Sequence, residues 1–167
     1  MELDHHYRVS TVWQGNLGTG TSGYRHYSRA NEVTAAGKLH PIAGSSDRPF
    51  HGDPERWNPE ELLLAALSQC HLLSYLHVAT RHGIVVTAYS DEAVGTMHQV
   101  GDGGAFSEAV LRPVVTISAG DPEVARTIHA EAARLCFIAS SVNFPVRHEP
   151  TILGLSGGPT NPRPDHG

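Results

Sequence analysis

Two cysteines, Cys70 and Cys136, are the residues of this chain best suited to covalent chemistry. They are the only cysteines in 167 residues, which is too few for a disulfide scaffold, and they lie too far apart for a CxxC motif. Each lies in a segment that we expect to be helical. They are therefore either two inert core thiols or one reactive pair, and free cysteine is so often buried that the count alone favours the inert reading.

A reactive Cys70 would need a positive charge brought from elsewhere in the chain. The thiolate is the nucleophilic form, and a free cysteine with a pKa of about 8.5 is mostly thiol at neutral pH. Cys70 lies roughly 18 Å from the start of its predicted helix, at about 1.5 Å per residue. The helix dipole acts only within the first turn, so it does not reach this thiol. Arginine is the side chain that stays charged when it is desolvated.

The strongest helix signal in the sequence begins at Asn58 and includes Cys70. Asn58 suits the N-cap, Pro59 suits the first helical position, and Glu61 completes a capping-box pattern. We expect this helix to run to about Arg81 or His82 and to end at Gly83. It is apolar nearly all round, which predicts a buried helix. One of its faces carries Leu63, Ala66, Cys70, Leu73 and His77.

The remaining patterns complete the order ββ–α–ββ–α–β, which is an α+β layout. Strands over residues 6–14 and 24–33 flank a glycine-rich stretch that contains a literal GxGxxG at Gly18, Gly20 and Gly23. We interpret this stretch as a hairpin loop, because no helix pattern follows it. We further predict an irregular segment over 35–57, strands over 84–100 and 106–118, a helix capped by Asp121 that reaches Cys136, and a last strand over 146–153.

The length suits a single domain over residues 1–155, followed by a tail, residues 156–167, that we expect to be disordered. The net charge of −5 and the absence of a basic patch argue against nucleic acid as a partner. We find no apolar run of about 18 residues and no signal-peptide pattern. We therefore expect no membrane association and a cytoplasmic location, where a disulfide is transient.

The segment Asn58-Pro59-Glu60-Glu61-Leu62, followed by Cys70, resembles the signature of the OsmC/Ohr family of organic hydroperoxide reductases. In that signature a cysteine lies ten residues after the first glutamate, as Cys70 lies ten residues after Glu60. Cys136 fits the place of the family's second cysteine. The resemblance extends over about residues 7–153.

The resemblance implies a specific fold and reaction. The fold would be OsmC-like, with antiparallel sheets wrapped around two long central helices in an intertwined homodimer. Cys70 would attack an organic hydroperoxide, and Cys136 would resolve the product as a transient disulfide that a lipoyl-type dithiol reduces. Glu60 and an arginine would support the thiolate. The resemblance implies neither a cofactor nor a metal.

The sequence departs from the family pattern at two places. Phe137 follows Cys136 where the family usually has proline. The arginine is the second departure, since Arg48-Pro49-Phe50-His51-Gly52 resembles the family's arginine segment with one insertion, and Arg25 or Arg29 are the alternatives. Glu60 lies about 15 Å from Cys70 along one helix. Either an arginine bridges this distance or the partner chain's helix supplies the glutamate, which is the option we favour.

Two other classes of function remain open. The chain could be a non-catalytic module that keeps both thiols and binds a small apolar or thiol ligand. It could also bind a metal through cysteine and histidine, since His71 and His77 lie beside Cys70 on one helix. Two ligands on one helix are weak evidence for such a site, and we expect these histidines to be satisfied or partly exposed.

Overall fold

The computed structural model describes residues 3–154, so the predicted disordered tail lies outside the described residues. The chain divides into two compact units, the first ending at Leu63 and the second beginning at Leu64. We describe each unit by itself. Residues 3–154 combine helices with β-sheets, which confirms the α+β class.

The first unit contains a three-stranded antiparallel sheet. Strands β1 (Ser10–Trp13) and β2 (Asn31–Thr34) form the predicted hairpin, but both are shorter than predicted. Residues 24–30 form turns instead of a strand, because the Arg29 guanidinium donates hydrogen bonds to the carbonyls of Tyr24 (2.7 Å) and Tyr27 (2.8 Å).

The GxGxxG stretch is a loop, as predicted. Gly18 and Gly20 have φ of 110° and 57°, in the region that favours glycine. Their N–H groups both donate to Oδ1 of Asn16, at 2.9 Å and 3.0 Å, and no helix follows. The segment predicted to be irregular contains two short elements that we did not predict, β3 (Ile42–Gly44) and the 3₁₀ helix η1 (Arg48–Phe50).

Helix α1 (Pro59–Arg81) has the predicted limits. The capping box is formed, since the Glu61 N–H donates to Oδ1 of Asn58 at 2.8 Å and the Asn58 N–H donates to Oε2 of Glu61 at 3.3 Å. Gly83, with φ of 67°, follows its end. By length and composition alone this helix could cross a bilayer. Its C-terminal half instead supplies Tyr75 and Val78 to the core of the second unit.

The second unit is built on a long hairpin that breaks once in each arm. One arm consists of β4 (Val85–Asp91) and β5 (Val94–Val100), and the other consists of β6 (Gly103–Leu111) and β7 (Pro113–Ala119). The sequence pattern predicted each arm as one continuous strand region. At the break the Arg112 N–H donates to Oδ1 of Asp91 at 2.7 Å, so this amide makes a hydrogen bond to a side chain in place of a backbone hydrogen bond to a neighbouring strand.

The last predicted strand is also two strands, β8 (Val146–His148) and β9 (Thr151–Gly154). Pro150 lies between them and has no N–H for a ladder. Strand β8 pairs in parallel with β6, and β9 pairs in parallel with β7, so the sheets are β5-β6-β8 and β4-β7-β9. Both sheets are therefore mixed, where the prediction gave antiparallel sheets.

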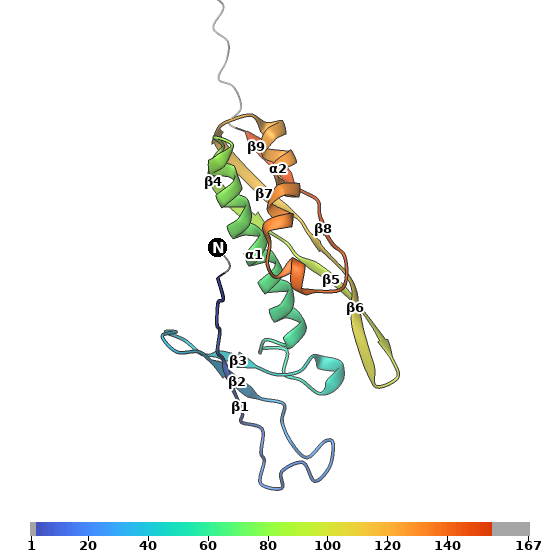
Figure 1. The fold of residues 1–167 in the computed structure, drawn as a ribbon. Coiled ribbons are helices and arrows are strands. Elements are labelled where there is room, and N and C mark those ends of the chain that lie inside the picture. Colours follow the sequence, from blue (N-terminus) through green and yellow to red (C-terminus); the bar gives the residue numbers. More distant parts are fainter. Residues whose placement is uncertain (1–2, 155–167) are drawn as a thin grey trace, which may run out of the picture. The chain divides into compact units, whose positions relative to one another are not determined.

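The core of the second unit lies between the β4-β7-β9 sheet and two helices, α1 and α2 (Pro122–Leu135), which pack on the same side of it (Figure 1). Helix α2 begins at the predicted N-cap, where Oδ1 of Asp121 accepts a hydrogen bond from the Glu123 N–H at 2.7 Å. The largest fully buried side chains include Tyr75, Leu67, Leu111 and His71.

The prediction that α1 is buried all round is wrong for the isolated chain. The helix buries the face that carries Leu67, His71, Tyr75 and Val78. On the predicted face, Cys70 is half-buried and Leu73 is 61% exposed. A helix without a polar face has no periodicity that selects one side, and the packing of α2 and the sheet makes the selection.

Candidate functional site

Cys70 and Cys136 are brought together in the second unit. Cys70 lies on α1 and is half-buried, whereas Cys136 is 1% exposed and forms the C-cap of α2. Cys70 lies close enough to Cys136 to contribute to the raised pKa of that thiol. Cys70 is the less buried of the two cysteines.

The backbone at Cys136 is extended, with φ and ψ of −76° and 106°. Phe137 follows it, and the Phe137 side chain is 75% exposed. The Cys136 carbonyl accepts hydrogen bonds from the N–H (3.1 Å) and hydroxyl (3.1 Å) of Ser140 in the turn that follows. These two hydrogen bonds hold the turn against the end of α2.

The Cys136 thiol is held in its neutral form. Burial, more than any other effect, raises its pKa to about 11, with a smaller contribution from the neighbouring Cys70. Two backbone contacts act in the opposite direction, those with Ala139 and Ile138, and the Ala139 N–H donates to the Cys136 sulfur at 3.4 Å.

Two buried imidazoles, His71 and His129, and the half-buried His148 form a cluster that the sequence did not predict. Nε2 of His71 and Nδ1 of His129 are 3.0 Å apart and joined by a hydrogen bond. The His148 ring from β8 lies 4.1 Å from the His71 ring, centroid to centroid. Tyr75 stacks on His129 at 4.0 Å. His71, Tyr75 and Val78 are spaced four and three residues apart, so they share one face of the helix. This spacing was the one sign in the sequence that His71 could be a core residue.

These imidazoles are neutral at physiological pH. Burial first, and then the neighbouring histidines, lower the pKa of His71 to about 3 and that of His129 to about 4. The pKa of His148 is lowered by burial and partly restored by the charge of Asp91. His77, which the sequence grouped with His71, is exposed. Within residues 3–154 no three His, Cys, Asp or Glu side chains are arranged to hold a metal ion.

The other predicted site residues belong to the first unit. Oε2 of Glu60 is buried and has no hydrogen-bond partner among the described residues. Arg29 is engaged by its own turn, with its guanidinium over the rings of Tyr24 and Tyr27 at 4.4 Å and 4.2 Å. Within residues 3–63 neither Arg25 nor Arg48 forms an ion pair. Two cations and one buried carboxylate oxygen are therefore left without partners there.

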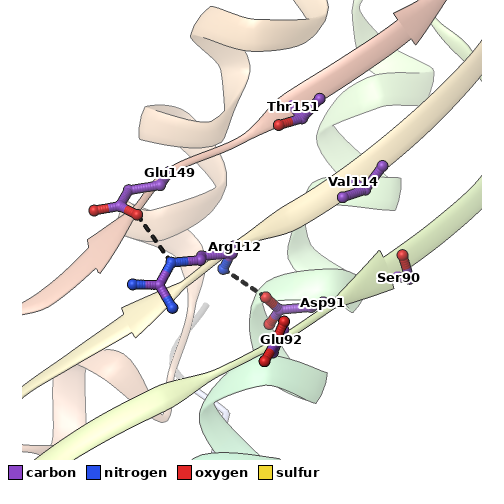
Figure 2. Close-up of a pocket in the computed structure, with 7 residues that line it drawn as sticks. All are labelled: Ser90, Asp91, Glu92, Arg112, Val114, Glu149 and Thr151. Carbon is purple, nitrogen blue, oxygen red and sulfur yellow. Dashed lines mark hydrogen bonds and ion pairs between the residues drawn. The ribbon is translucent and has the colours of Figure 1, made fainter.

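A polar hollow of about 530 Å³ lies at the break in the long hairpin (Figure 2). Figure 2 shows the Arg112 guanidinium bonded to Glu149 at 3.0 Å and the Arg112 backbone bonded to Asp91. The other Asp91 oxygen accepts a hydrogen bond from the Ser68 hydroxyl of α1. Neither cysteine lines the hollow, so we assign it to the architecture of the strand break.

The chain matches proteins that share this fold. The family model for OsmC-like proteins matches residues 52–151. YmaD of Bacillus subtilis (strain 168), named as an uncharacterized protein, is 24% identical over 146 residues, which is 83% of this chain and 87% of YmaD.

Two solved structures illustrate the likeness. An OsmC-like protein of unknown function from Vibrio cholerae is 28% identical, with a TM-score of 0.78 over 88% of this chain and 99% of that one. The organic hydroperoxide resistance protein OsmC of Legionella pneumophila is 16% identical, with a TM-score of 0.65 over 91% of this chain and 99% of that one. At that identity the second likeness concerns the fold alone. From the family match and the shared fold, this chain belongs to the family of OsmC-like proteins.

Proposed function

We propose that this protein is a thiol-dependent peroxidase that reduces organic hydroperoxides to alcohols through Cys70 and Cys136. The observation that carries the proposal is that the half-buried Cys70 lies close enough to the buried Cys136 to contribute to its raised pKa. Two inert core thiols have no need to meet, whereas a two-cysteine peroxidase needs this arrangement. Relatives by fold from Legionella pneumophila and Elizabethkingia anophelis are named organic hydroperoxide resistance proteins.

The reaction balances with these two thiols and an added dithiol. The Cys70 thiolate attacks the terminal peroxide oxygen, the O–O bond breaks, and the leaving alkoxide takes a proton to become the alcohol. Cys70 is then a sulfenic acid. Cys136 attacks its sulfur and expels water, forming the Cys70–Cys136 disulfide. A lipoyl-type dithiol returns both thiols and is itself oxidised.

Cys136 needs help to become a nucleophile, because its pKa is raised. The Ala139 N–H, which already donates to this sulfur, is the group that stabilises its thiolate during the second step.

We propose that an arginine, Arg48 or else Arg25, stabilises the Cys70 thiolate and the departing alkoxide, and that Glu60 orients it. The buried oxygen of Glu60 that lacks a partner is suited to accept from a guanidinium. Because Glu60 lies about 15 Å from Cys70 along α1, we propose that the glutamate of the partner subunit acts at each site.

The same reasoning gives the substrate class, the assembly and the compartment. Leu73 lies on the same face of α1 as Cys70, and Phe137 directly follows Cys136. Their side chains are 61% and 75% exposed, and an exposed apolar surface beside the thiols suits organic peroxides better than hydrogen peroxide. The exposed apolar face of α1 supports a homodimer. The mechanism suits a reducing cytoplasm, where thiols are regenerated.

Intact-mass spectrometry tests the proposal directly. One equivalent of tert-butyl hydroperoxide should convert the wild type to a disulfide that has lost two hydrogens, and dihydrolipoamide should restore it. In Cys136→Ser, excess peroxide should add two or three oxygens to Cys70 irreversibly, because no thiol resolves the sulfenic acid. Cys70→Ser should consume no peroxide. Oxygen gain alone in the wild type would contradict the two-cysteine reaction and make Cys136 a core thiol.

A further inference from the structure

We propose that the hydrogen-bonded pair His71–His129 positions Cys136 against Cys70 and so controls the rate of disulfide formation. The inference rests on the two-cysteine function proposed above. His71 follows Cys70 directly on α1, and His129 lies two helical turns before Cys136 on α2. The 3.0 Å contact between their rings therefore joins the two helices that carry the thiols.

The surroundings of the pair fix it in one arrangement. His71 and His129 are 0% and 3% exposed, so water does not compete for their ring nitrogens. Tyr75 of α1 faces His129 and His148 of β8 faces His71. Behind them, Tyr89 of β4 packs on Tyr75, and Asp91 of β4 acts on His148. Among these titratable neighbours only Asp91 is an acid, and its oxygens are already bonded to Ser68 and the Arg112 N–H.

Each ring also has one nitrogen that is buried without a partner, Nδ1 of His71 and Nε2 of His129. A neutral imidazole donates through one nitrogen and accepts through the other, so the bond between the rings is the only one that this pair makes among the described residues. No second hydrogen bond holds either ring if this one is lost. The pair is therefore a clamp between α1 and α2 that depends on one hydrogen bond.

A clamp at this place matters because disulfide formation tolerates little displacement. The two Cα atoms must come within about 7 Å in the right orientation. A shift of about 1 Å between reacting groups costs up to about a hundredfold in rate. The first step needs Cys70, the peroxide and the proposed arginine and glutamate, and none of these residues lies on α2.

The test separates the two steps by stopped-flow and quenched mass spectrometry in the full chain. His129→Phe keeps the ring volume beside Tyr75 but removes the hydrogen bond. We expect sulfenic acid to form on Cys70 within about twofold of the wild-type rate and the disulfide to form at least about tenfold more slowly. His129→Gln can restore a hydrogen bond to His71 and should recover most of the disulfide rate.

The matched control is Tyr75→Phe, which removes another hydrogen bond between α1 and α2, from the Tyr75 hydroxyl to the Ala125 carbonyl (2.9 Å). This variant should leave the ratio of the disulfide rate to the sulfenic acid rate unchanged, because Tyr75 lies one helical turn further from Cys70 than His71 does. His71→Phe removes the clamp from the other helix and supplies the measurement if His129→Phe does not fold.

Two failures are distinguishable. If the wild type forms no disulfide, the proposed function itself is wrong. If the wild type forms the disulfide and both phenylalanine variants form it at the same rate, or Tyr75→Phe slows it as much as they do, the positioning role is overturned.

Discussion

Acid should destabilise this protein in a pH window set by its buried histidines. Burial lowers the pKa of His71 to about 3 and of His129 to about 4, from an ordinary value of 6.5. The unfolded chain therefore takes up a proton on each ring at a pH where the folded chain does not. Above about pH 6.5 neither state is protonated at these rings, and they do not reduce the free energy of unfolding. The free energy of unfolding then decreases as the pH falls from about 6.5 towards the folded pKa values.

The magnitude follows from the two pKa values of each ring. Between pH 7 and pH 5 each imidazole removes about 2 kcal/mol from the free energy of unfolding, so the pair removes on the order of 4 kcal/mol. This is a large part of the roughly 5–15 kcal/mol by which a typical folded domain is stable. Most carboxylates remain ionised above about pH 5, which leaves the histidines as the main titrating groups in the window.

Urea unfolding at pH 7, 6 and 5, at one fixed protein concentration, measures this loss. The double variant His71→Phe/His129→Phe is the control. It removes both buried imidazoles, so its free energy of unfolding should fall by about 4 kcal/mol less than that of the wild type over the same window. Equal pH dependence in the two proteins would refute the assignment of the loss to this cluster.

Three further predictions concern the thiols, the arginine and the assembly. At pH 7.5, iodoacetamide should label Cys70 first, and Cys136 should react about 100-fold more slowly than in the unfolded chain, because its pKa is raised from 9.0 to about 11. Equal labelling of the two cysteines by peptide mass spectrometry would contradict this. Either Arg48→Ala or Arg25→Ala should slow the reaction of Cys70 with peroxide by about tenfold, equivalent to roughly 1.4 kcal/mol, and if neither does, the arginine proposal fails. Sedimentation at micromolar concentration should give a homodimer, and a monomer would also remove the partner subunit's role for Glu60.

Local chemistry made the helix limits predictable. Asn58 and Asp121 are N-cap residues whose side chains reach the first amides of the helix, so the signal and the structure involve the same few residues. The cysteine positions were also predictable, because the motif around Cys70 fixes its place on α1.

Tertiary contacts decided what the sequence did not reveal. The break in the long hairpin depends on the Asp91–Arg112 contact, and the break between β8 and β9 falls at Pro150. The parallel pairing of β8 with β6 and of β9 with β7 joins segments that are far apart in the chain. His71 was missed as a core residue because α1 is apolar on several faces, and periodicity cannot then select the buried one. The roles of Glu60 and the arginines remain predictions.

The parallel pairing of β8 and β9 has a consequence for synthesis on the ribosome. Strands β6 and β7 have each paired on one side once the long hairpin forms, but their other edges stay open until residues 146–154 emerge. Open strand edges are templates for association with other chains. His148 joins the imidazole cluster in the same late event, since β8 carries it. Nascent chains stalled before Val146 should therefore be the most prone to aggregate, and the second unit should acquire its native core only when the last two strands add to both sheets.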